Sequence, residues 1–125
     1  MRISSKITKA INDQIAYEAS STHAYLAIGS WCERTGYDGS AVFFFEQANE
    51  EHLHMLKFIH YLNNAGAEAI IPATDKPQAK FDKLESTFQA GMGSEQTVTK
   101  LINNLVEHAE REKDRATYSF LQWFV

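Results

Sequence analysis

Apolar residues recur at alternating intervals of three and four positions along two long stretches of the chain, a spacing typical of helices that pack in a bundle. The first stretch predicts a helix from about Ser5 to Arg34. The second predicts a helix that Asp38 or Ser40 could cap and that continues to about Asn64. Only a short turn with two glycines separates them. So short a connection requires the two helices to lie antiparallel.

The same spacing predicts a third helix with two alternative starts. On helix propensity alone it begins at Ser94, which with Glu95 forms a favourable N-terminal cap. Leu84 continues the apolar spacing upstream, so packing in the folded protein could extend the helix back to that residue. We expect it to end near Asp114. A fourth, strongly apolar helix opens at about Tyr118 and stops after barely two turns, so we expect it to continue beyond this sequence.

The segment between the second and third helices, residues 67–82, contains Pro72 and Pro77 and is hostile to helix. At roughly 3.3 Å per extended residue it could reach about 50 Å, whereas the second helix is only about 40 Å long. The segment can therefore run the length of the bundle. The pattern predicts one all-α domain over residues 1–125, a four-helix bundle with a long crossover loop between helices 2 and 3 and a fourth helix cut short.

Two polar residues interrupt the apolar stripe of the second helix. Glu51 and His54 lie three positions apart, between Phe44 and Phe58, where the spacing requires buried apolar side chains. An unpaired ionised carboxylate in a core costs roughly several kcal/mol unless it is protonated or bound to a cation. Because Glu and His at positions i and i+3 project to one side of a helix, they can share a metal ion.

Acidic residues also lie on the apolar stripes of the first and third helices. Glu18 is near the middle of the first stripe, with Tyr25 two turns further along the same face. Glu95 begins the third stripe. Acids are common at the solvated ends of bundles, so each one alone is a weak indication. The three acids and the histidine together predict an internal, carboxylate-rich metal site.

Composition narrows the function classes. A net charge of −4 over 125 residues argues against nucleic-acid binding, which requires a basic face. No run approaches the roughly 18 apolar residues of a membrane span, and we expect no secretory signal at the N-terminus. Cys32 is the only cysteine, which excludes an internal disulfide and a cysteine-based metal site. We therefore expect a cytoplasmic protein with neither nucleic-acid nor membrane partners.

Several short motifs follow one another along the chain. They are Ala16-Tyr17-Glu18 followed by Tyr25, Trp31-Cys32, Asn49-Glu50-Glu51-His52-Leu53-His54-Met55, the proline-bearing loop, Ser94-Glu95-Gln96, and Phe120-Leu121-Gln122-Trp123-Phe124-Val125. With these motifs the chain resembles the bacterial non-haem ferritins, within the ferritin-like di-iron family. The resemblance covers the whole chain.

The resemblance implies an iron-storage subunit with ferroxidase activity, which oxidises Fe(II) to Fe(III) with O2 or H2O2 at a di-iron centre inside one subunit. Glu18 would bind the first iron and not the second, and Glu51 would bridge both irons. His54 would be the remaining ligand of the first iron. Glu95 would serve the second iron, and Tyr25 would be a catalytic residue beside the centre, able to hydrogen-bond a ligand or donate an electron. The resemblance also implies assembly into a homo-24-mer, a hollow shell that stores ferric mineral.

Two departures from the family pattern modify this expectation. The family's further ligands lie in the fourth helix, past the last residue here, so within this sequence the second iron keeps only Glu51 and Glu95. If the given sequence is the whole molecule, we expect the second iron to bind weakly. Haem-binding ferritins place a methionine directly after the bridging glutamate. This chain has His52 there, so we expect no haem.

Three other assignments compete with this one. A non-catalytic structural or assembly subunit would need Lys or Arg partners for its buried acids, and none lies on the acid-bearing stripes. A peroxide-reducing di-iron protein of the rubrerythrin kind usually carries an iron–sulfur module that needs four cysteines, and this chain has one. The twelve-subunit ferritins build their site between subunits, whereas Glu18, Glu51 and His54 are expected to converge within one bundle.

Overall fold

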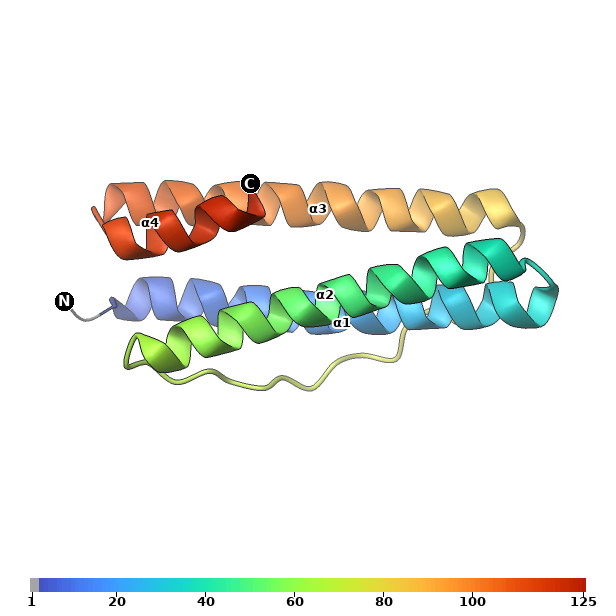
Figure 1. Cartoon of the computed structure of the whole chain (residues 1–125), viewed down its shortest axis with the longest axis horizontal. Helices are drawn as coiled ribbons and strands as arrows, with labels where there is room; N and C mark the ends of the chain where they lie inside the picture. Colours follow the sequence, from blue (N-terminus) through green and yellow to red (C-terminus); the bar gives the residue numbers. More distant parts are fainter. Residues whose placement is uncertain (1–2) are drawn as a thin grey trace.

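The computed structural model describes residues 3–125 as three long helices and a short fourth one (Figure 1). These are α1 (Ser5–Thr35), α2 (Asp38–Asn64), α3 (Leu84–Arg111) and α4 (Arg115–Leu121), followed by a short 3-10 helix, η1 (Gln122–Phe124). α1 packs against both α2 and α3, and α4 packs against α3. This is the predicted all-α four-helix bundle, with a crossover loop between helices 2 and 3 and a short fourth helix. Within residues 3–125, no helix is both long and apolar enough to cross a membrane.

The start of α3 follows packing and not local propensity. The helix begins at Leu84, upstream of the Ser94 cap that propensity favours. Thr87 and Gly91, in its first three turns, are buried. Their burial offsets the cost of glycines within a helix, about 1 kcal/mol each relative to alanine. The helix ends at Arg111, slightly before the predicted end.

The turn between α1 and α2 contains Gly36 in the left-handed conformation, at φ 94°, where glycine ends α1 without strain. Tyr37 precedes α2 and makes no side-chain cap bond, so the prediction that Asp38 or Ser40 caps this helix is wrong. Asp38 lies instead in the first turn, where its negative charge interacts favourably with the helix dipole.

α4 begins earlier than predicted because of a cap that the apolar pattern does not reveal. The carboxylate of Asp114 accepts a hydrogen bond from the backbone N–H of Thr117 at 3.0 Å. The Thr117 hydroxyl donates to the same carboxylate at 2.6 Å. The helix therefore starts at Arg115, three residues before the Tyr118 expected from the apolar run.

The core consists of two apolar clusters. The first contains Ile7, Ile11, Ile15, Phe58, Leu62, Ile102, Leu105, Ala109 and Leu121. The second contains Tyr25, Ile28, Trp31, Cys32, Ala41, Phe44 and Ala48. Full burial of a large apolar side chain stabilises the fold by about 1.5–3 kcal/mol. Along α1 and α2, the residues between the two clusters include the buried acids Glu18 and Glu51.

The crossover loop runs along the length of the bundle, as predicted (Figure 1). Three side chains of α1, eleven residues or about three helical turns apart, bind it along one line of the helix. The contacts are Asn12 with the carbonyl of Glu68 and the N–H of Ile70, His23 Nδ1 with Thr74 Oγ1 at 2.8 Å, and Arg34 with the carbonyl of Ala79 at 2.6 Å. The loop thereby delivers the chain to the end of the bundle where α3 starts.

Two helix glycines provide a matched test of how closely α1 and α2 pack. A Cβ at Gly29 would lie 2.9 Å from the ring of Phe45, whereas a Cβ at Gly93 would meet nothing within 4 Å. We expect Gly93→Ala to raise the free energy of unfolding by about 1 kcal/mol through helix propensity. Gly29→Ala should not raise the free energy of unfolding in this way, because the new methyl group strains the α1–α2 contact. Urea denaturation measures both values, and an equal gain at Gly29 would contradict the close packing.

Candidate metal centre

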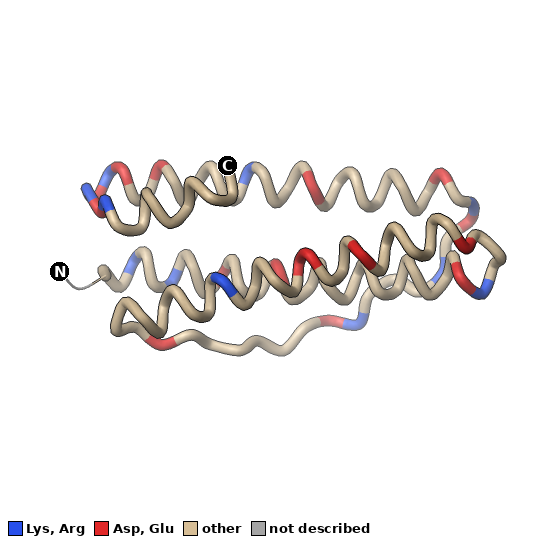
Figure 2. Tube along the Cα trace, in the orientation of Figure 1, with Lys and Arg blue, Asp and Glu red and all other residues tan. Residues whose placement is uncertain are grey.

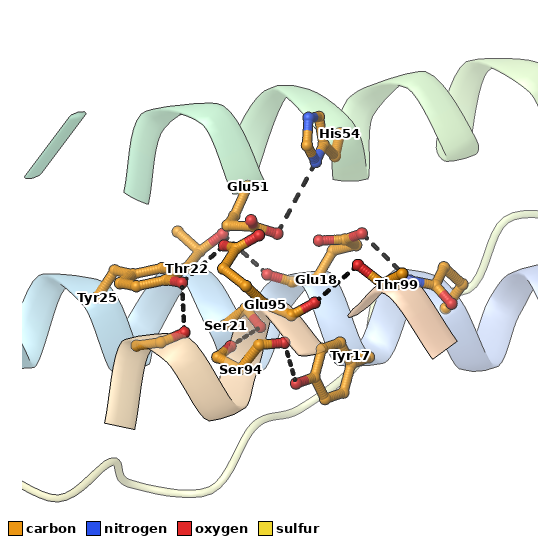
Figure 3. Close-up of polar contacts among 12 residues, drawn as sticks. Tyr17, Glu18, Ser21, Thr22, Tyr25, Glu51, His54, Ser94, Glu95 and Thr99 are labelled. Carbon is orange, nitrogen blue, oxygen red and sulfur yellow. Dashed lines mark hydrogen bonds and ion pairs between the residues drawn. The ribbon is translucent and has the colours of Figure 1, made fainter. Parts of the chain in front are cut away.

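Glu18 of α1 and Glu51 of α2 place their carboxyl groups in the same buried space. Their exposed fractions are 0% and 2%, and Figure 3 shows both side chains between the helices. His54, one turn after Glu51, completes a group in which one ligand atom from each residue lies within 4.8 Å of the others. Figure 2 shows acidic segments of α1, α2 and α3 near the middle of the bundle. The structure therefore brings together three of the four predicted metal-binding side chains.

Each residue of this group has one buried polar atom that no other residue among 3–125 satisfies. Glu18 Oε2, Glu51 Oε2 and His54 Nδ1 are buried and have no hydrogen-bond partner. His54 Nδ1 lies 3.8 Å from Glu51 Oε2, which is too long for a hydrogen bond. Among residues 3–125, no Lys or Arg forms an ion pair with either carboxylate. Buried acceptors that face one another without a donor favour a cation, and two carboxylates with one imidazole suit a transition metal.

The raised pKa of Glu51 also favours a bound cation at this site. Burial raises the pKa of Glu51 to about 10, with further contributions from the adjacent carboxyl groups of Glu18 and Glu95. Without a cation, Glu51 therefore holds a proton at neutral pH. A bound cation would favour the ionised form instead, so metal binding would release that proton.

Glu95 is not one of the three residues grouped within 4.8 Å, and it is exposed, although its place on the α3 stripe predicts burial. Its carboxyl group nevertheless lies close enough to Glu51 to contribute to the raised pKa of that residue. Further along α3, Ile102, Leu105 and Ala109 are buried as predicted. Leu121 of α4 belongs to the apolar cluster around Leu105 and Ala109, whereas Glu95 belongs to neither apolar cluster.

Tyr25 connects Glu95 to the buried group. Its phenol is 2% exposed, donates a hydrogen bond to Glu95 Oε1 at 2.7 Å, and lies 3.3 Å from the carbonyl oxygen of Gly91. Burial, followed by the hydrogen bond to Glu95 and its charge, raises the pKa of Tyr25 far above its ordinary value. The phenol therefore stays protonated and holds the Glu95 carboxylate toward Glu51, as Figure 3 shows.

The C-terminal segment holds the imidazole of His54. The rings of Trp123 and Phe124 lie edge-on to His54, with centroids 5.7 and 5.6 Å away. Lys57 Nζ lies 4.0 Å from the centre of the Trp123 ring, a favourable cation–π contact. The apolar C-terminal segment therefore packs against the histidine of the candidate site.

Gln14 is a further buried polar residue on the stripe of α1, and it was not among the predicted site residues. Gln14 is 3% exposed, and its side-chain amide donates a hydrogen bond to Glu18 Oε1 at 3.1 Å. The signal was present in the sequence, because Gln14 precedes Glu18 by four positions and so lies on the same helix face.

Comparisons with known proteins agree with this geometry. The sequence matches the ferritin-like domain family over residues 8–125. It is 40% identical to the bacterial non-heme ferritin of Staphylococcus aureus (strain USA300) and 38% identical to that of Staphylococcus haemolyticus (strain JCSC1435). Each match extends over 123 residues, which are 98% of this chain and 74% of the relative.

Solved structures give the same result. The ferritin of Chlorobium tepidum and the open-pore ferritin of the hyperthermophilic archaeon Archaeoglobus fulgidus each superpose with a TM-score of 0.95 at 36% identity. Both comparisons cover 98% of this chain and 76% of the other. With the bundle, the crossover loop and the buried acid–histidine group in place, these matches show that the chain belongs to the ferritin family of iron-storage proteins.

Proposed function

We propose that this chain is a ferroxidase, which binds Fe(II) between Glu18, Glu51 and His54 and oxidises it to Fe(III) with O2 or H2O2. One observation carries the proposal: Glu18, Glu51 and His54 each offer a ligand atom within 4.8 Å of the others, and each has a buried polar atom with no hydrogen-bond partner among residues 3–125. The ferritin relatives support iron as the metal. Within the described residues 3–125, neither carboxylate has a Lys or Arg partner, which disfavours a purely structural role for the acids.

The ligand types suit oxidation of iron. Carboxylates are hard, charged oxygen ligands that bind Fe(III) better than Fe(II), so Glu18 and Glu51 favour the oxidised ion. The imidazole of His54 retains affinity for the incoming Fe(II). Burial strengthens both effects because charges interact more strongly away from water.

A second iron ion would complete the proposed di-iron centre. Glu51 would bridge the two ions, and Glu95, held by the Tyr25 phenol, would be the second ion's other ligand. Two Fe(II) ions supply the two electrons that, with two protons, convert O2 to H2O2. Because Glu95 is exposed and stands outside the three-residue group, the second ion should bind more weakly than the first.

We also propose that the chain works as one domain in the cytoplasm, in a homo-24-mer that encloses stored ferric mineral. Several large apolar side chains remain exposed on the isolated chain and are available for contacts between subunits. They include Leu26, Val42, Phe43, Leu53, Ile71 and Met92.

Two neighbouring histidines of α2 allow a matched test of the proposed activity. His54 belongs to the candidate site, whereas His52 is exposed. His54→Ala should slow oxidation of stoichiometric Fe(II) in air by at least about tenfold, while His52→Ala should keep the native rate. The rate is followed by stopped-flow absorbance of the ferric product. Equal rates for the native chain, the His54 variant and protein-free buffer would refute the proposal.

A further inference from the structure

Gln14 is a buried amide in the apolar stripe of α1, next to a candidate ligand. We propose that Gln14 is a positioning residue, whose amide holds one oxygen of Glu18 so that the other oxygen is presented to the metal ion. The inference rests on the proposed function of the same site. It adds a residue that does not itself touch iron.

The two carboxyl oxygens of Glu18 lie in different surroundings. Oε1 accepts the hydrogen bond from Gln14 Nε2 at 3.1 Å, whereas Oε2 is buried and has no partner. The amide N–H of Gln14 is the donor and the Glu18 oxygen the acceptor, so the N–H side of the amide faces Glu18. Gln14 therefore fixes the orientation of the carboxylate and leaves Oε2 free for the metal ion.

The surroundings of Gln14 strengthen this bond. Ile11 and Ile15, on either side of it in the helix, are both 0% exposed. Breaking the bond would leave Glu18 Oε1 without its donor in the core, at a cost of about 1–3 kcal/mol. The amide and the carboxylate therefore hold each other in one arrangement.

An amide is also the appropriate kind of donor, because it carries no charge. A Lys or Arg at this position would hold Glu18 equally well, but its positive charge would neutralise the carboxylate and repel a metal cation. A neutral amide fixes the ligand without placing a positive charge beside the metal site. Hydrogen bonds of this kind to a ligand's second atom commonly tune metal affinity.

The test uses Co²⁺ alone as the probe, titrated into the metal-free protein and followed by calorimetry and by the visible absorption of cobalt. Gln14→Met keeps the side-chain length but removes the donor, and Gln14→Asn withdraws the amide by one methylene group. Both should weaken Co²⁺ binding by about 10- to 100-fold. Both should also change the cobalt spectrum at saturation, because both Glu18 oxygens become free to bind.

Thr87→Val is the matched control, since it removes a buried side-chain hydrogen bond to the backbone of Leu84, in the first turn of α3. It should keep the native affinity and spectrum.

Native affinity and spectrum in the Gln14 variants would overturn the role of Gln14 and leave the proposed function intact. Absence of saturable Co²⁺ binding by the native chain would contradict the proposed function and the role of Gln14 with it. If circular dichroism shows that Gln14→Met does not fold, Gln14→Asn decides.

Discussion

Glu51→Gln should abolish protein-dependent oxidation of Fe(II) and at the same time stabilise the metal-free protein. Glu51 would be the one ligand shared by both ions, so its loss affects both. The amide has nearly the shape of the carboxyl group but cannot carry the negative charge that favours Fe(III). The rate of Fe(II) oxidation in air should therefore fall to that of protein-free buffer.

The gain in stability has a separate cause. Glu51 Oε2 is buried without a hydrogen-bond partner, and the carboxyl group must take up a proton to remain in the core. Removing that requirement should raise the free energy of unfolding at neutral pH by about 1–3 kcal/mol, the usual cost of an unsatisfied buried group. Glu50→Gln, at the exposed neighbouring position, should change neither property. A Glu51→Gln variant that oxidises iron at the native rate, or is less stable than the native protein, would contradict this account.

The metal-free protein should lose stability as pH rises from mildly acidic to alkaline values. Burial, followed by the neighbouring carboxyl groups, raises the pKa of Glu51 from 4.5 to about 10 in the folded protein. Between these two values the folded chain keeps a proton that the unfolded chain releases. The free energy of unfolding therefore falls with pH, by at most about 1.4 kcal/mol per pH unit. The stabilisation of the folded protein by this retained proton is fully present below pH 4.5 and is lost as the pH approaches 10.

Urea denaturation in the presence of a chelator, at one protein concentration and between about pH 5.5 and 8.5, measures this slope. Glu51→Gln should flatten it, because the group that holds the proton is gone. Bound metal should also flatten it, because the cation replaces the proton on Glu51. A stability that rises with pH in the native protein but not in Glu51→Gln would show that the sign is wrong.

Helix α2 shows why most of the candidate site could be predicted from the sequence. The three-four spacing fixes which side chains share a face, and Phe44 and Phe58 identify that face as the buried one. Glu51 and His54 fall between them, so their position follows from local periodicity alone. The same reasoning places Glu18 on α1, and the structure brings all three together.

Glu95 shows where this reasoning ends. Its stripe on α3 is correctly identified, yet the residue is exposed because burial depends on which other helix covers that part of the stripe. The start of α3 likewise depends on packing around Thr87. The loop contacts of Asn12 and Arg34 are made largely with backbone atoms of residues 68–79, which leave no pattern in the sequence.

An anaerobic titration of the metal-free chain with Fe(II), followed by admission of air, tests the central claim most directly. The native protein should bind a first Fe(II) ion tightly and a second more weakly, release protons as it does so, and then develop ferric absorbance faster than buffer. Glu51→Gln should do none of these. Fe(II) binding by the native chain no stronger than that of the variant, with oxidation at the rate of buffer, would contradict the assignment of Glu18, Glu51 and His54 as the iron-oxidising site.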